Sequence, residues 1–312
     1  MNTWSCHPAR WFTPTRSAPV VLALLACYLV WGSTYLAIRV ALVSFPPFFQ
    51  MGSRFLVAGL LLMGWVLGRR VLSSGDRPAF ALPTARQWAH AGVIGSLMLG
   101  AGMGLTAQAS VAIGSGLIAA CIAVVPMMIG GWGLLWGRRP SVSECLGMVL
   151  GLGGVLLLVR GASFAASPLS MLCMVGATAA WSLGSVLSTT RYPLAPGAAG
   201  FASEMLCGGV VLLAVSWALG ERPSWPPQPA AAAAWLYLVV LGSLVAFSAY
   251  LYLLRHASPA LASSYAFVNP LIALLLGSVM AGEAVSPREW MACGVIMTAV
   301  LVILLARQSR RA

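Results

Sequence analysis

Long apolar runs, separated by short breaks rich in arginine, proline and glycine, fill the chain from residue 18 to residue 306. One helical membrane crossing needs about 20 predominantly apolar residues. Runs of about this length recur along the whole chain, and they predict ten membrane-spanning helices. The expected spans cover residues 18–40, 46–68, 86–107, 111–136, 142–160, 168–190, 196–219, 232–254, 258–281 and 289–306.

The composition of the 312-residue chain agrees with a membrane protein and excludes other classes. Hydrophobic residues make up 60% of the chain and charged residues 8%, whereas soluble domains carry roughly 25% charged residues. A disordered chain is excluded because such chains are poor in apolar residues. The seven cysteines show no CxxC or other ligand spacing, so we expect no disulfide framework, no metal site and no cofactor.

All 18 basic residues are arginines, and the formal net charge is +12. They stand singly or in pairs between the apolar runs, which is typical of topology signals, so no nucleic-acid partner is expected. With ten spans, thirteen arginines fall on the side of the two termini and four on the opposite side. Because positively charged loops stay in the cytoplasm, both termini are expected to be cytoplasmic.

The two halves of the chain carry matching residues in the same order. Each half holds five spans, an odd number, so the second half crosses the membrane in the opposite sense. We therefore predict an all-α membrane protein with ten transmembrane helices arranged as two inverted five-helix repeats. The matches are Trp31 with Trp181, Ser53-Arg54 with Ser203-Glu204, Gly95-Ser96-Leu97 with Gly242-Ser243-Leu244, Pro126 with Pro270, and Glu144 with Glu289.

Inverted repeats are typical of secondary transporters, whose substrate site lies near the membrane midplane between the repeats. The expected segments are a cytoplasmic N-terminal tail at 1–17, a first repeat at 18–160, a second repeat at 168–306 and a cytoplasmic C-terminal tail at 307–312.

Arg54 and Glu204 are the ionisable residues that lie away from the ends of the expected spans. At 1.5 Å per residue, they are expected about 3 Å on either side of the midplane, so we hypothesise that they form an ion pair. A static pair that fixes helix packing is favoured, because a neighbouring arginine opposes protonation of a carboxylate. The alternative is that Glu204 binds a coupling proton or a cationic substrate group.

Aromatic and neutral polar residues on matched faces are candidates for lining a substrate cavity. Such a lining suits amphipathic ligands and, through the ring faces, cationic ones; the alternative is contact with lipid or anchoring at the membrane surface. The candidates are Trp31, Ser33, Tyr35, Gln108, Trp181, Tyr250, Ser264, Tyr265 and Asn269.

Pro126 and Pro270 occupy equivalent places in the fourth and ninth spans. A proline inside a helix leaves the carbonyl four residues earlier without its hydrogen bond. The two prolines are therefore candidate hinges or kinks, or equally fixed bends.

Several motifs resemble a known family. They are Tyr28-Leu-Val-Trp-Gly-Ser-Thr-Tyr35, Arg54-Phe-Leu-Val-Ala-Gly59, Ser258-Pro-Ala-Leu-Ala-Ser-Ser-Tyr-Ala-Phe-Val-Asn-Pro270 and Gly282-Glu283. They are similar to the drug/metabolite transporter (DMT) superfamily, in its ten-helix branch with two EamA domains, which includes YedA-like exporters. The resemblance implies export of amino acids, related metabolites or drugs across the bacterial inner membrane through a central cavity. Gly137-Arg138 departs from the pattern of Gly282-Glu283, which puts in doubt an acidic role at the first of these loops.

The expected function is therefore that of a secondary transporter, either a monomer or a homodimer, with a small-molecule substrate and the lipid bilayer as its partners. An enzyme is not expected, because no paired carboxylates, histidine cluster or nucleophile with a base occurs at membrane depth. A lipid flippase or a non-transporting membrane scaffold remains the alternative.

Overall fold

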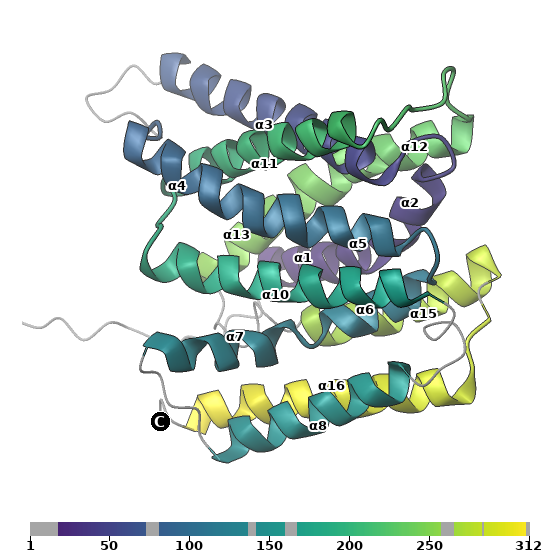
Figure 1. Cartoon of the computed structure of the whole chain (residues 1–312). Helices are drawn as coiled ribbons and strands as arrows, with labels where there is room; N and C mark the ends of the chain where they lie inside the picture. Colours follow the sequence, from purple (N-terminus) through teal and green to yellow (C-terminus); the bar gives the residue numbers. More distant parts are fainter. Residues whose placement is uncertain are drawn as a thin grey trace, which may run out of the picture.

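The computed structural model describes residues 18–72, 81–136, 142–159, 167–256, 265–282 and 284–309. Every regular element within these ranges is a helix, so the prediction of an all-α protein is confirmed. Most of the helices run roughly side by side across the molecule (Figure 1).

The first half of the chain forms long helical segments, some of which combine successive elements. Two of the segments contain π-helical stretches, η1 and η2, in which backbone hydrogen bonds connect residues five apart. The elements are α1 Ala18–Leu25, η1 Ala26–Trp31, α2 Gly32–Ala41, α3 Pro47–Leu72, α4 Ala85–Gly95, η2 Ser96–Met103, α5 Gly104–Ala109, α6 Ser115–Ile122, α7 Val125–Gly133, η3 Leu134–Trp136 and α8 Val142–Val159.

The second half contains one π-helical stretch, η4, among the residues that the structure describes. It lies between α12 and α13, in the segment that the sequence matches with α4, η2 and α5. The elements are α10 Pro168–Thr190, α11 Ala198–Ala218, α12 Pro229–Tyr237, η4 Leu238–Val245, α13 Ala246–His256, α15 Tyr265–Ala281 and α16 Pro287–Ser309.

Seven helical segments within the described ranges are long and apolar enough to cross a membrane. Shorter apolar helical stretches lie in α8, at Cys145–Gly154, and in α15, at Val268–Met280. The seven segments are Ala18–Ala41, Pro47–Leu72, Ala85–Ala109, Ser115–Gly133, Pro168–Ser188, Ala198–Ala218 and Pro229–Tyr250.

Local capping interactions fix where several helices begin and end. The Thr84 hydroxyl accepts a hydrogen bond from Gln87 N, and the Gln87 side chain accepts one from Thr84 N, which is a capping box at the start of α4. Ser286 N donates to Glu289 Oε2 over 2.7 Å at the start of α16. After α11, Gly220 takes a φ of +68°, a conformation that glycine adopts without steric cost.

The start of α3 is capped by a residue from the other half of the chain. The backbone N–H groups of Phe48 and Phe49 donate to the two carboxylate oxygens of Glu221, over 3.2 and 2.8 Å. A carboxylate is stabilised at this position because the first N–H groups of a helix are unpaired and carry partial positive charge. Beside it, Gln228 N donates to Ser44 Oγ over 2.9 Å. The loop between α11 and α12 is thereby fastened to the link between α2 and α3.

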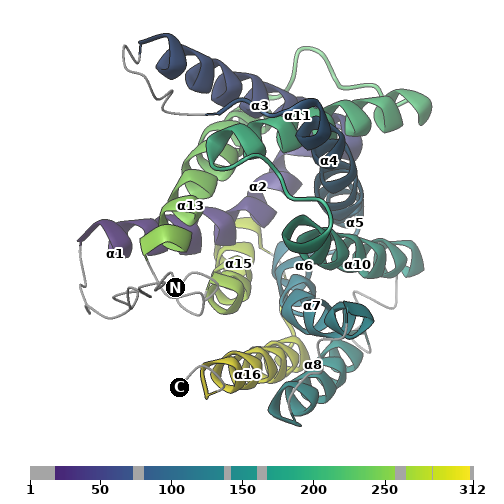
Figure 2. The ribbon, with the colours of Figure 1, turned by 90° about the vertical axis from the view of Figure 1, so that its left-hand side faces the viewer.

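α3 and α11 lie side by side in both views of the ribbon (Figures 1 and 2). A Cβ atom added at Gly59 would lie 3.0 Å from Leu206 N, and one added at Gly209 would lie 2.8 Å from Leu56 N. The two backbones therefore approach as closely as glycine allows. The contacts run antiparallel, and they are reciprocal, because Leu206 and Gly209 each stand 150 positions after Leu56 and Gly59.

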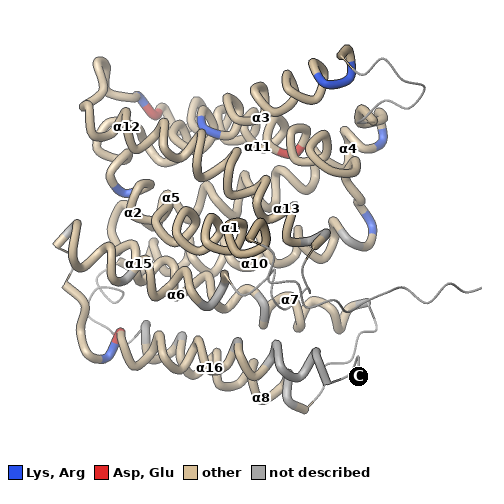
Figure 3. Tube along the Cα trace, turned by 180° about the vertical axis from the view of Figure 1, so that it is seen from behind, with Lys and Arg blue, Asp and Glu red and all other residues tan. Residues whose placement is uncertain are grey.

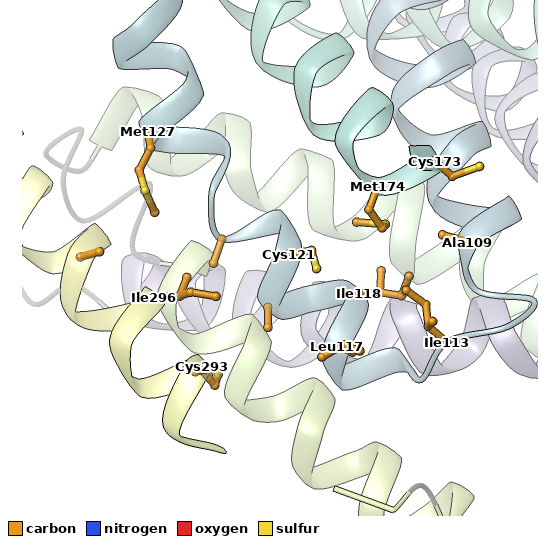
Figure 4. Packing of buried hydrophobic residues seen from close by; sticks show 14 residues of the cluster. Ala109, Ile113, Leu117, Ile118, Cys121, Met127, Cys173, Met174, Cys293 and Ile296 are labelled. Carbon is orange, nitrogen blue, oxygen red and sulfur yellow. The ribbon is translucent and has the colours of Figure 1, made fainter. Parts of the chain in front are cut away.

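α8 and α16 form a second pair, at the opposite end of the molecule from α3 and α11 (Figure 2). A large apolar cluster joins α16 to the segments α5–α7 and to α10 (Figure 4). Its buried members are Ala109, Ile113, Leu117, Ile118, Ala120, Cys121, Ala123, Met127, Cys173, Met174, Ala292, Cys293, Ile296 and Ala299.

Apolar side chains also cover much of the outer surface. Val71, Trp217 and Val279 are each more than 80% exposed, which is costly in water but favourable against lipid chains. The charged residues of the described ranges lie mainly near the ends of the helices (Figure 3). This distribution is that of a protein surrounded by a bilayer.

We predict that Gly59→Leu destabilises the fold, because the new side chain would meet the backbone of α11. Overpacking of this kind costs about 1–3 kcal/mol. The measurement is the thermal unfolding midpoint of the detergent-purified protein. The matched control is Gly64→Leu on the same helix, where an added Cβ meets nothing within 4 Å. Equal midpoints for the two variants would contradict the prediction.

Candidate functional site

Arg54 lies two turns into α3 and is 2% exposed. Its Nε donates a hydrogen bond to Ser243 Oγ over 2.9 Å, and its Nη1 lies 3.8 Å from Met51 Sδ. Its Cζ stands 4.9 Å from the centre of the Phe55 ring. These partners are a hydroxyl, a thioether and an aromatic ring, so none of them carries a negative charge.

The π-helical stretch η4 shapes the other side of this site. Ser243 Oγ donates to Leu238 O, five residues earlier, and accepts from Arg54. A Cβ atom added at Gly242 would lie 3.0 Å from Arg54 Nη2 and 3.1 Å from Thr34 Cγ2. The absence of a side chain at residue 242 therefore lets the guanidinium group lie against the backbone of η4. π-Helical turns occur frequently at functional sites.

Four aromatic rings pack together beside Gly242, and we call them the aromatic cluster: Trp31, Phe247, Tyr250 and Tyr265. Trp31 Nε1 donates to Gly242 O over 3.2 Å. The Trp31 ring centre lies 5.3 Å from that of Phe247, 5.4 Å from that of Tyr250 and 4.7 Å from that of Tyr265. These side chains come from η1, α13 and α15, so three segments that are distant in the sequence meet here.

Two further candidates from the sequence make polar contacts near the cluster. The hydroxyl groups of Ser33 and Tyr237 share a hydrogen bond of 2.5 Å. The side-chain nitrogen of Asn269, when its amide is oriented to suit its surroundings, donates to Tyr265 O over 3.1 Å and to Tyr28 O over 3.3 Å. Asn269 therefore ties α15 to η1, the two segments that carry Tyr265 and Trp31.

The remaining cavity candidates have different surroundings. Tyr35 is half-buried on α2 and packs against the large apolar cluster around α6 and α16. Trp181 lies on α10 against η2, where a Cβ added at Gly102 would stand 3.2 Å from its ring, and no ring contact joins it to the aromatic cluster within the described ranges. Gln108 is half-buried on α5, which packs against α10 and α3. Ser264 lies outside the described residues.

The structure does not bring Arg54 and Glu204 together as an ion pair. In the antiparallel register that Gly59 and Leu206 set, Glu204 stands level with Leu61. Leu61 is seven residues beyond Arg54, which is about 10 Å along the helix. The hypothesis of a central ion pair is therefore not supported, because the two residues lie on opposite sides of the crossing point.

The backbone of Glu204 lies against a different helix, α4. Glu204 is 5% exposed, and a Cβ added at Gly95 on α4 would lie 2.7 Å from its carbonyl oxygen. Its carboxylate has no hydrogen-bond or ion-pair partner among the described residues. Nor do three or more His, Cys, Asp or Glu side chains gather within those ranges as a metal site would require.

The two matched prolines lie in different local structures. Pro126 falls in the first turn of α7, directly after the break between α6 and α7 at residues 123–124, which is visible in Figure 4. Pro270 lies inside α15, which runs without interruption from Tyr265 to Ala281. Their use as hinges remains a prediction.

Sequence reasoning missed three residues of this site. Ser243 belongs to one of the repeat matches, but the sequence does not mark it as a partner of Arg54, and no pattern singles out Phe247. Gln50 is fully buried; its Nε2 donates to Ile38 O over 3.0 Å, and its Oε1 has no hydrogen-bond partner. Its spacing of four residues before Arg54, which places both on one helix face, is the signal that could have found it.

The comparisons with known proteins agree with the helical architecture. The model of the EamA-like transporter family matches residues 18–160 and 168–305. The chain belongs to the EamA-like transporter family. The resemblance seen in the sequence motifs is thereby confirmed.

Individual relatives match nearly the whole chain. The chain is 38% identical to the uncharacterized inner membrane transporter YedA of Escherichia coli K12 over 290 residues. This match covers 93% of the chain and 92% of YedA. The chain is 25% identical over 300 residues to the uncharacterized transporter YvbV of Bacillus subtilis 168, covering 93% of each. A solved crystal structure shares the fold, with a TM-score of 0.62 at 23% identity, over 93% of this chain and 98% of that chain.

We predict that Ser243→Ala lowers the stability of the protein, because Arg54 loses the acceptor of its Nε–H. A hydrogen bond to a charged group is worth about 1.5–3 kcal/mol. The thermal midpoint of the purified variant is the measurement. Ser248→Ala, at an exposed position on the neighbouring α13, is the control and should leave the midpoint unchanged. A stability loss no larger than that of the control would argue against the contact.

Proposed function

We propose that this protein is a secondary transporter that exports small amphipathic metabolites, amino acids or drugs by alternating access between two inverted five-helix repeats. The observation that carries the proposal is the composition of the candidate site. Trp31 and Arg54 come from the first half of the chain, whereas Ser243, Tyr250 and Tyr265 come from the second half. A site between two halves opens and closes when the halves move relative to each other.

The pattern of helix contacts supports the inverted repeat and the ten spans. α3 packs on α11, α6 on α15 and α8 on α16, so each pair joins a helix of the first half to its counterpart in the second. α10 packs on η2 and α1 packs on α13, which are again equivalent contacts. Because self-complementary contacts of this kind are a mark of two-fold symmetry, we propose that α8, α15 and α16 cross the membrane together with the seven long apolar segments.

We further propose that the protein is a multi-pass protein of the bacterial inner membrane with both termini in the cytoplasm. The name of its relative YedA places that protein in the inner membrane. Thirteen arginines on the side of the termini, against four opposite, favour this orientation. We propose the family-matched segments as the two repeats, and Pro126, Pro270 and the π-helical stretches as the places where the helices bend during transport.

The first test is efflux of labelled compounds from proteoliposomes that contain the purified protein. The panel holds amino acids, organic cations and a fluorescent phospholipid, and empty liposomes are the control. We expect saturable efflux of at least one small molecule. Movement of the phospholipid alone would replace the proposal by a flippase, and no movement by a folded protein would favour a scaffold.

We also propose that Glu204 binds the coupling proton. Burial of a charged carboxylate without a counterion is costly, and binding of a proton removes that cost. Among the described residues, Cys207 lies one turn away on α11 itself. On the helices packed against α11, the nearest charged or titratable residues by position are Arg54 on α3, about 10 Å away along the pair, and His90 on α4, whose Nδ1 lies 2.9 Å from Pro193 O.

Glu204→Gln is therefore expected to transport with a rate that no longer depends on pH between about 5 and 8. The wild type should respond to pH across this range. Initial efflux rates in a pH series measure the effect, and His90→Gln is the control that should keep the dependence. Unchanged pH dependence in Glu204→Gln would remove the coupling role.

A further inference from the structure

The buried positive charge of Arg54 has no negative partner within the described part of the chain. The sequence contains six acidic residues. Glu204 lies one heptad away along the α3–α11 pair, while the carboxylates of Glu221 and Glu289 cap α3 and α16. The other three, Asp76, Glu144 and Glu283, fall at or beyond the ends of the expected spans.

A guanidinium group buried without a counterion is costly in free energy. Arg54 donates its Nε–H to Ser243 Oγ, and its Nη1 has only the Met51 thioether as an acceptor. Arginine presents a planar fork of N–H donors that fits the two oxygens of a carboxylate. The remaining donors of Arg54 are therefore matched to an anionic group that the described part of the protein does not supply.

Gln50 adds a second, independent observation at the same place. It is 0% exposed, and its Oε1 is a buried acceptor without a donor. Its Nε2 is held by Ile38 O, so the amide cannot turn its nitrogen to this side without losing that bond. Gln50 and Arg54 are four residues apart on one face of α3. One helix face thus offers an unsatisfied cation and, one turn away, an unsatisfied acceptor.

The aromatic cluster lies next to these polar groups. Trp31 bonds to Gly242 O, and Gly242 in turn lies against Arg54 Nη2, so the indole and the guanidinium group are separated by one residue of η4. A compound with a carboxylate at one end and an apolar body of about the size of a phenyl ring would contact both.

We propose that Arg54 anchors the carboxylate of the transported compound, that Gln50 Oε1 accepts a hydrogen bond from a donor on the same compound, and that the aromatic cluster receives its apolar part. This inference rests on the proposed function for its physiological meaning. The binding chemistry itself is tested without transport.

The test compares four ligands that share a phenyl ring: phenylalanine, 3-phenylpropionate, phenylalaninamide and phenethylamine. The first two carry a carboxylate and the last two do not. Binding to the detergent-purified, full-length protein is measured by thermal stabilisation and by quenching of tryptophan fluorescence. The variants are Arg54→Gln, Arg54→Lys and Gln50→Leu, with Arg86→Gln, an exposed arginine at the start of α4, as the matched control.

We expect the two carboxylates to bind the wild type and Arg86→Gln equally. Arg54→Gln should weaken the binding of both carboxylates by roughly 10- to 100-fold, because a charge-assisted hydrogen bond is lost. Arg54→Lys should weaken their binding by a smaller factor, because lysine keeps the charge but lacks the planar fork of donors. If Arg54→Gln does not fold, Arg54→Lys provides the comparison with the wild type. Gln50→Leu should weaken the binding of phenylalanine, which has an ammonium donor, but not the binding of 3-phenylpropionate.

Equal binding of the amide and the carboxylates, or carboxylate binding that is indifferent to both Arg54 variants, would overturn the inference. Ligand binding that follows this pattern without efflux from proteoliposomes would uphold the anchor and reject the proposed function. Efflux limited to compounds without a carboxylate would uphold the proposed transport function and reject the carboxylate anchor.

Discussion

The close approach of α3 to α11 is the contact on which the arrangement of the site depends. Inside a bilayer, apolar surface gains little by leaving lipid, so helices associate mainly through van der Waals packing and interhelical hydrogen bonds. Gly59 and Gly209 allow the two backbones to meet directly, each against a leucine of the other helix. Because this contact is reciprocal, it fixes the height of every residue on one helix relative to the other. The positions of Arg54 and Glu204 follow from it.

Because Arg54 and Glu204 are separated along the helix pair, the molecule has two different buried places with an ionisable side chain instead of one. Arg54 faces η4, in the second half of the chain, and Glu204 lies beside α4, in the first half. Each is thus enclosed by a helix of the opposite half. The halves are related in their contacts, yet the two places differ in charge, so the ligand and the coupling proton proposed above would have chemically distinct partners within one framework.

The sequence predicted the helical architecture and part of the site. Lengths of apolar runs are a direct consequence of bilayer thickness, so the helices and their order could be predicted, and Trp31, Tyr250 and Tyr265 do lie together. The Arg54–Glu204 pair could not be judged in this way. Heights counted from the starts of spans ignore the register of the packed helices, which depends on where glycines face each other. Ser243 carries no sequence signal that separates it from other polar residues, because its partner Arg54 lies 189 residues away in the chain. Gln50 is marked only by its spacing of four residues from Arg54, and its contact with Ile38 O cannot be seen in the sequence.

The cap on α3 has a mechanical consequence for the alternating access proposed above. Glu221 and Ser44 fasten the connection between α11 and α12 onto the start of α3 through hydrogen bonds that cross from one half to the other. In the proposed movement these bonds would hold this corner together, so the halves would rotate about it and separate more at the opposite ends of α3 and α11.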